Sequence, residues 1–330
     1  MRLSRTLGFT NYLKIFASIL LLVSTPLSAQ IQFKEALVNT PLQSASIYGI
    51  AEDNHGFIWT LSSEGVSRYD GYNVEFFQPN PNQAGAILEG ALNQLIADQL
   101  GQIWIASSAG LSRYDDKTNT FINYSASNSA LISGYVTAIA HGANGSLLIA
   151  DTDGLYRFQL SNNTIERFSA KNYPAAEINF IHEDNDKIWL STREQGVYAL
   201  DKQTSIIYDL NDTNPWDFQF LQSQIYAIQR FAGSTWVGSI DGLFEITSAG
   251  VARDVFLAAD RPDLKNMEVR DIKIVDNTLW LATSDGILTM GADKVIKQRL
   301  INASVQNDPS NYLMSMLTDS KGVTWVGSFD

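Results

Sequence analysis

The stretch that decides the fold is Asp98-Gln99-Leu100-Gly101-Gln102-Ile103-Trp104-Ile105-Ala106-Ser107-Ser108-Ala109-Gly110-Leu111-Ser112-Arg113-Tyr114-Asp115. It contains a turn, a short apolar run around Trp104, a second turn that ends on Gly110, and another run of strand-forming residues. Acidic, aromatic and basic residues lie so close together in this part of the sequence that the stretch first suggests a functional site. Variants of it recur along almost the whole chain, however, and that recurrence changes the interpretation.

The recurrence is regular. Aligned on the glycine that ends the second turn, consecutive copies are separated by 45, 44, 42, 46 and 44 residues. These glycines are Gly65, Gly110, Gly154, Gly196, Gly242 and Gly286. The tryptophans of the apolar runs follow the same lattice, with Leu148 in the third copy: Trp59, Trp104, Trp189, Trp236, Trp280 and Trp325. A catalytic constellation is built once, so residues that repeat specify the architecture rather than a chemistry.

Each copy predicts four short strands. The first strands are expected at Ser46–Glu52, Asn93–Asp98, Tyr135–Ala140, Ile178–Glu183, Ile225–Phe231, Val269–Val275 and Tyr312–Thr318. The tryptophan strand follows, then a strand that begins at the turn glycine. A fourth strand is clearest in the early copies, at Val74–Phe77, Thr120–Tyr124, Thr164–Phe168 and Thr204–Tyr208.

Four strands in a period of about 44 residues are the signature of a β-propeller. The tryptophan strands are apolar throughout, as expected where neighbouring blades pack on both faces of a sheet. The turn glycines are expected at positive φ, and the tryptophans between adjacent blades. We therefore predict an all-β propeller of seven four-stranded blades with the last blade incomplete.

Composition and charge exclude several classes of function. The chain has 330 residues and a formal net charge of −12, which disfavours binding to nucleic acid or to an anionic membrane surface. It has no cysteine, which excludes disulfides, zinc thiolate sites and thiol nucleophiles. No cofactor and no metal site are predicted.

The N-terminus predicts export. Arg2, Arg5 and Lys14 precede the apolar run Ile15–Val23, which has the length of a secretory signal core and is short for a membrane span. We expect a signal peptide over residues 1–29, cleaved after Ala29, and a propeller over residues 30–330. The alternative is an uncleaved anchor helix.

Three copies carry a family resemblance. Asp53–Trp59 followed by Glu64–Gly71, then Asp98–Asp115, and then Asp319–Gly327 share Asp-x-x-Gly-x-(Ile/Thr)-Trp, and the first two continue to Gly-(Leu/Val)-x-Arg-Tyr-Asp. This pattern resembles the two-component regulator propeller family over residues 32–330. Copies five and six depart from it, with Glu245 and Thr289 where the arginine is expected.

The resemblance implies a non-catalytic periplasmic sensor region. In that family the propeller region is followed by an immunoglobulin-like domain, one membrane helix and a histidine kinase or diguanylate cyclase. Membrane attachment is therefore expected only through a downstream helix. The implied partner is a small extracellular ligand, which is a carbohydrate for some members, or a second copy in a dimer. Copy seven reaches Asp330 before its third strand, so we expect a fragment of a longer sensor, with residues 31–40 adding one outer strand.

Ligand contact is expected from aromatic residues that do not repeat. Trp216 is the tryptophan that the period does not explain, Phe218 lies beside it, and Tyr173 and Tyr312 lie in comparable segments between blades. Such rings stack on sugars and anchor protein contacts. The alternative is local packing of long loops.

Other candidate sites have simpler explanations. Calcium binding by turn acids such as Asp151, Asp241 and Asp285 is disfavoured, because each turn offers one or two carboxylates. A sialidase-like arginine triad of Arg68, Arg113 and Arg157, and catalysis by His55, His141 or His182, lack a supporting motif. The alternative functions are a secreted glycan-active propeller enzyme and a protein-interaction scaffold for homodimerisation.

Overall fold

The structure, a computed structural model, describes residues 46–329 except for residues 132, 194, 211–223, 249–251, 259–261 and 302–308. The predicted signal peptide over residues 1–29 and the predicted outer strand over residues 31–40 lie outside these described residues. No helix among them is both long and apolar enough to cross a membrane.

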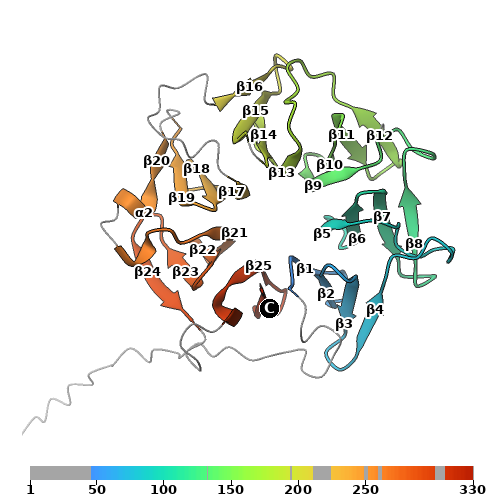
Figure 1. The fold of residues 1–330 in the computed structure, drawn as a ribbon, viewed down its shortest axis with the longest axis horizontal. Coiled ribbons are helices and arrows are strands. Elements are labelled where there is room, and N and C mark those ends of the chain that lie inside the picture. The colour runs from blue at the N-terminus through green and yellow to red at the C-terminus, as the bar shows by residue number, and fades with distance from the viewer. Residues whose placement is uncertain are drawn as a thin grey trace, which may run out of the picture. The chain divides into compact units, whose positions relative to one another are not determined.

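Seven antiparallel sheets surround a common centre, and each is one blade of a propeller (Figure 1). The first strand of every blade lies nearest the centre. These inner strands are β1 (Gly49–Glu52), β5 (Leu92–Ala97), β9 (Val136–Gly142), β13 (Ile178–Glu183), β17 (Ile225–Phe231), β21 (Val269–Val275) and β25 (Leu313–Thr318). All seven overlap the predicted first strands closely.

The second strands carry the repeated tryptophans or Leu148. They are β2 (Ile58–Leu61), β6 (Ile103–Ser107), β10 (Ser146–Asp151), β14 (Lys187–Thr192), β18 (Ser234–Ser239), β22 (Thr278–Thr283) and β26 (Thr324–Ser328). The third strands are β3 (Val66–Tyr69), β7 (Gly110–Asp115), β11 (Gly154–Gln159), β15 (Val197–Asp201), β19 (Gly242–Ile246) and β23 (Gly286–Met290). The fourth strands are β4 (Val74–Phe77), β8 (Thr120–Tyr124), β12 (Thr164–Arg167), β16 (Ile207–Asp209), β20 (Ala252–Asp254) and β24 (Ile296–Leu300).

The all-β propeller is confirmed, and the blade count needs one correction. Blades 1 to 6 are the consecutive sets β1–β4, β5–β8, β9–β12, β13–β16, β17–β20 and β21–β24. Among the described residues the seventh sheet has only β25 and β26, so six blades rather than seven have four strands. These two strands match the first two strands of the other blades in order and pairing.

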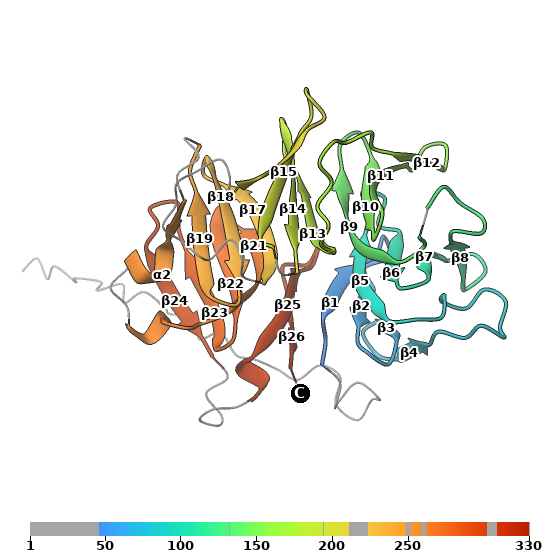
Figure 2. The ribbon, with the colours of Figure 1, turned by 45° about the horizontal axis from the view of Figure 1, so that its top comes forward.

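The ring is closed through its inner strands, because each one contacts the inner strands of both neighbouring blades. At the junction of blades 7 and 1, the backbone N–H of Ile47 donates to the carbonyl of Ser328 at 3.1 Å. The Ser315 hydroxyl donates to the Ile47 carbonyl at 3.0 Å. The tilted view also shows the sheets arranged around the central axis (Figure 2).

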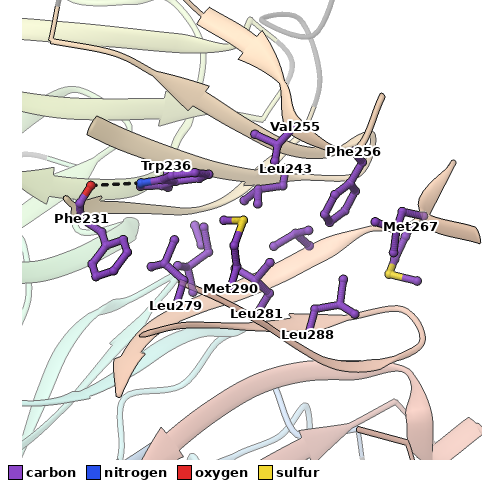
Figure 3. Close-up of a cluster of buried hydrophobic side chains, with 14 residues drawn as sticks. Phe231, Trp236, Leu243, Val255, Phe256, Met267, Leu279, Leu281, Leu288 and Met290 are labelled. Carbon is purple, nitrogen blue, oxygen red and sulfur yellow. Dashed lines mark hydrogen bonds between the residues drawn. The ribbon is translucent and has the colours of Figure 1, made fainter. Parts of the chain in front are cut away.

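Apolar clusters between adjacent blades form the core. Figure 3 shows the cluster between blades 5 and 6, where Trp236 of β18 packs against Leu279 and Leu281 of β22. The short helix α2 (Val255–Ala258) adds Phe256 to the outer end of this cluster. Trp59 and Trp104 occupy equivalent places and are completely buried. The apolar second strands therefore follow from packing on both faces.

The glycine of the second turn has positive φ in five of the six four-stranded blades. Gly65, Gly110, Gly196, Gly242 and Gly286 have positive φ, as predicted. A Cβ on Gly110 would also overlap the carbonyl oxygen of Tyr124 in the fourth strand. Gly154 is the exception, since its φ is not positive, and the expectation for it was wrong. There, a Cβ would lie 2.7 Å from Nε of Arg167, which belongs to an exposed and flexible side chain that can move aside.

Candidate functional site

A cavity of about 340 Å³ lies at the outer part of blade 3, beside the segment that leads to blade 4. The start of β11 supplies Gly154 and Leu155, and the end of β12 supplies Arg167. The inter-blade segment that follows supplies Phe168 to Ala170 and then Tyr173. A smaller cavity of about 190 Å³ shares Phe168 to Ala170 and continues toward Lys202 of blade 4.

Tyr173, one of the predicted ligand residues, lines the larger cavity. Its ring packs on the apolar cluster between blades 3 and 4, and its hydroxyl donates a long hydrogen bond of 3.4 Å to the carbonyl of Asp151. Burial, reinforced by the nearby carboxylate of Asp151, raises the pKa of Tyr173 well above its ordinary value. The hydroxyl therefore stays protonated at every physiological pH and can donate a hydrogen bond.

Arg167 supplies the positive charge of the larger cavity. Its guanidinium donates to the carbonyl of Asp153, which fixes its position beside Gly154. The side chain is otherwise exposed, so N–H donors remain for a ligand. Together with the rings of Tyr173 and Phe168, this arrangement places aromatic side chains beside a cation. The guanidinium of Arg157 lies over the Phe168 ring, 5.3 Å from its centre. The arrangement is suited to bind a small ligand with a ring and an acceptor group.

Tyr312 belongs to a different part of the propeller. Its hydroxyl donates to Glu268 at 2.6 Å and accepts a hydrogen bond from Arg270. The guanidinium of Arg270 lies 3.9 Å from the ring centre of Tyr226 and pairs with Glu268 at 2.5 Å. Burial and the hydrogen bond to Glu268 raise the pKa of Tyr312. These contacts join blades 5, 6 and 7, while the buried Nε of Arg270 has no hydrogen-bond partner among the described residues.

The four predicted ligand residues are therefore not brought into one site. Tyr173 lines a cavity near blade 3, and Tyr312 packs in the cluster of blades 5 to 7. Trp216 and Phe218 lie outside the described residues. Arg167 and Phe168 were missed as site residues, because a strand end with this composition resembles any solvated turn.

The repeated acid, tryptophan and glycine residues form a recurring structural contact, which we call the Asp–Trp clasp. In blade 2, Oδ2 of Asp98 accepts the indole N–H of Trp104 at 2.8 Å, and Oδ1 accepts the backbone N–H groups of Leu100 and Gln102. Asp53 with Trp59 and Asp319 with Trp325 repeat the arrangement in blades 1 and 7. The carboxylate oxygens are thus used by the turn itself.

Asp151, which precedes the second turn of blade 3, likewise has its carboxylate oxygens occupied by backbone groups. Both carboxylate oxygens of Asp151 accept backbone N–H groups, from Asp153 and from Ser133. In blades 2 and 5 a hydroxyl takes this place, because Ser107 and Ser239 donate to the turn glycine and accept the following N–H. Within the described ranges, no group of three or more His, Asp or Glu side chains is placed to hold a metal ion.

The three equivalent arginines each have partners in their own blade or in the next one. Arg68 pairs with Glu75 at 2.5 Å and donates to the Tyr114 hydroxyl, and Arg157 pairs with Glu183 at 2.9 Å. Arg113 lies 5.5 Å from the ring centre of Trp104. They therefore cover the outer edges of tryptophan strands or join adjacent blades, and they do not converge on one point as a sialidase-like triad would.

The histidines are also distributed over several blades. His55 lies on the first turn of blade 1, 3.9 Å from a carboxylate oxygen of Asp116. His141 and His182 lie near the ends of the inner strands β9 and β13. Burial lowers the pKa of His182, which favours its neutral form.

The fold of this chain is shared by other proteins of known structure. No protein-family model and no curated protein matches the chain. The extracellular domain of a hybrid two-component system from B. thetaiotaomicron superposes with a TM-score of 0.70 and 18% identity, over 87% of this chain and 39% of that one. The chain therefore shares the fold of this extracellular domain. The predicted resemblance to the two-component regulator propeller is thereby confirmed at the level of the fold.

Two further structures extend the comparison. The extracellular domain of a one-component system from B. thetaiotaomicron gives a TM-score of 0.69 and 17% identity, over 91% of this chain and 39% of that one. Streptogramin B lyase gives 0.65 and 16%, over 90% of this chain and 94% of that one. The chain spans about two fifths of the length of the two extracellular domains.

Proposed function

We propose that this propeller is the extracytoplasmic ligand-sensing part of a membrane-anchored signalling receptor, and that it binds its ligand without chemical turnover. The observation that carries the proposal is the cavity beside Tyr173, on a fold shared with the extracellular domains of two-component and one-component systems. The predicted signal peptide agrees with this location. The output would be a kinase or a cyclase in a further part of the protein.

The ligand chemistry follows from the cavity lining. Tyr173 and Phe168 provide ring faces, while Arg167 and Ser169 provide hydrogen-bond donors. A sugar or another small ring compound with a carboxylate or several hydroxyl groups fits this set. The volume of about 340 Å³ lies at the lower end of the range for small-molecule sites.

Thermal shift measurements against a panel of neutral and acidic mono- and disaccharides test the proposal. We expect at least one compound to raise the melting temperature of the wild-type protein, and Tyr173→Ala and Arg167→Ala to abolish the shift. Tyr72→Ala is the matched control, because Tyr72 is 94% exposed and lies on a turn of blade 1. A panel without any shift, or a shift that survives Tyr173→Ala, would reject this cavity as the sensing site.

The second candidate is an extracytoplasmic enzyme. It is favoured by the match to streptogramin B lyase, which covers nearly the whole of both chains. Product analysis by mass spectrometry, after incubation with the same saccharides and with a streptogramin B, distinguishes the two functions. Turnover that depends on protein concentration would replace the sensing proposal by catalysis.

A further inference from the structure

The segment that leads from blade 3 to blade 4 forms a wall shared by both cavities. At its start, the backbone N–H of Phe168 donates to the carbonyl of Leu155 in β11 at 2.8 Å. The N–H of Lys171 donates to the carbonyl of Ser205 in blade 4, and the Lys171 carbonyl accepts the N–H of Ile207, both at 3.0 Å. The segment is therefore fixed to one blade at its start and to the next blade three residues later.

Each cavity combines this wall with a different blade. Phe168, Ser169 and Ala170 line both cavities. Blade 3 and Tyr173 complete the larger cavity of about 340 Å³, and the end of β15 with the turn after it completes the smaller one of about 190 Å³. Small-molecule sites usually enclose about 300 Å³ or more, so the smaller cavity is too small to be a site of its own. Because the same three residues line both cavities, one molecule that passes across them can occupy both.

The charged groups of the smaller cavity are already compensated. The ammonium of Lys202 lies 2.9 Å from a carboxylate oxygen of Glu183 and donates to a backbone carbonyl at 3.2 Å. The carboxylate of Asp201 accepts two backbone N–H groups of its own turn, at 2.9 and 2.8 Å. The remaining lining includes the apolar side chain of Leu200 and the hydroxyl of Ser205. This end therefore favours an uncharged group.

The larger cavity keeps a positive charge that is not compensated in the same way. Arg167 donates to the carbonyl of Asp153, and it forms no ion pair within the described ranges. Its guanidinium retains N–H donors, and a carboxylate is the acceptor that bonds most strongly to them. The two cavities thus differ in polarity, and the positive charge lies at the end that Tyr173 also lines.

We propose that the two cavities are subsites of one site, which binds a ligand of two linked rings. A ring that carries a carboxylate lies against Arg167, and an uncharged ring lies against Leu200 and Ser205. The proposal rests on the sensing function proposed above and specifies the length and the polarity of the ligand. A second ring adds affinity because it removes further apolar surface from water.

Isothermal titration calorimetry with three defined compounds tests this proposal on the wild-type protein. Phenyl β-glucuronide has two linked rings and one carboxylate. Methyl β-glucuronide lacks the second ring, and phenyl β-glucoside lacks the carboxylate. We expect phenyl β-glucuronide to bind about tenfold more tightly than either of the others, because only this compound fills both subsites with matching polarity.

Two variants locate the two ends of the ligand. Ser205→Asn narrows the smaller cavity, and asparagine tolerates the positive φ of 57° at this position. We expect it to weaken binding of phenyl β-glucuronide about tenfold and to leave methyl β-glucuronide unchanged. Arg167→Gln should weaken both glucuronides and leave phenyl β-glucoside unchanged. Ala232→Asn is the matched control, because this exposed residue also has positive φ and lies on a turn of blade 5.

Four results would overturn the proposal. Equal affinity for phenyl and methyl β-glucuronide would exclude the second subsite, while the cavity beside Tyr173 would remain the sensing site. A preference for phenyl β-glucuronide that survives Ser205→Asn would place the second ring elsewhere. Equally tight binding of phenyl β-glucoside would mean that Arg167 does not select an acid. If none of the three compounds binds, the saccharide panel decides separately whether the cavity senses another ligand.

Discussion

The indole N–H of a buried tryptophan needs an acceptor, and three blades of this propeller supply one from the same turn. In blade 2 the carboxylate of Asp98 satisfies Trp104 and two backbone N–H groups together. Blade 5 uses the carbonyl of Phe231 for Trp236 instead. In blade 4 the buried Nε1 of Trp189 has no hydrogen-bond partner among the described residues. A blade can therefore form without the clasp. In blade 4 the consequence is a buried indole N–H that has no acceptor among the described residues.

The clasp predicts a specific loss of stability. Asp98→Ala removes the acceptor of the buried indole N–H of Trp104 and of two partly buried backbone N–H groups, and we expect the free energy of unfolding to fall by about 2 kcal/mol. Asp98→Asn should cost less, since its amide oxygen still accepts. Urea denaturation followed by tryptophan fluorescence measures both. Asp115→Ala in the same blade is the control, because its turn is exposed; an equal loss there would contradict the role of the clasp.

A buried carboxylate in blade 5 predicts a pH dependence. Burial alone would raise the pKa of Glu245, but Lys294, Ser234 and Arg253 bond to the carboxylate and hold the pKa below its ordinary value. The resulting stabilisation is fully present above the pKa of the unfolded chain, near 4.5. It is lost as the pH falls through the lower pKa of the folded state.

Glu245→Gln removes this contribution. Melting temperatures measured from pH 7 to pH 3 should show the variant less stable at pH 7, with a difference that narrows toward pH 3. Glu64→Gln, at an exposed turn position, is the control and should follow the wild-type curve. A constant difference between Glu245→Gln and wild type at all pH values would mean that packing rather than charge is responsible.

At the scale of elements, the period predicts the inner and second strands because both are apolar and bounded by glycine turns. Strand β20 (Ala252–Asp254) escaped prediction, since three residues with two charges carry no strand pattern. The cavity beside Tyr173 could not be predicted either, because its shape depends on the direction that the chain takes at Arg167 and Phe168, where the fourth strand ends. The Asp–Trp clasp is visible in the sequence as a constant spacing, because each of Asp53, Asp98 and Asp319 precedes its tryptophan by six residues.

Two glycines with positive φ, Gly110 and Gly71, should lose different amounts of stability when each is replaced by alanine. Gly110→Ala forces a side chain into a positive φ and against the Tyr124 carbonyl, and we expect a loss of about 3 kcal/mol in unfolding free energy. Gly71→Ala also meets positive φ, but no atom lies within 4 Å of its Cβ, so about 1 kcal/mol is expected. Urea denaturation compares the two; similar losses would show that conformation alone decides.

At the scale of the whole molecule, the ring depends on the junction between its last and first blades. The carboxylate of Glu52 in β1 accepts the backbone N–H of Ser320 at 2.7 Å and its hydroxyl at 2.6 Å. Ile47 adds the contacts to Ser315 and Ser328. These contacts hold β25 and β26 to β1, so their loss should loosen this junction before the other blades.

Glu52→Ala tests the order of opening. We expect backbone exchange in β25 and β26 to accelerate about tenfold, the equivalent of about 1.4 kcal/mol, because a charge-assisted contact is lost at the junction. Exchange in blade 4 should stay unchanged. Glu177→Ala, which removes a pair with the exposed Arg193 at 3.4 Å, is the control and should leave blade 7 unaffected. Uniform acceleration in all seven blades would mean that the junction supports the entire fold and that blade 7 does not open separately.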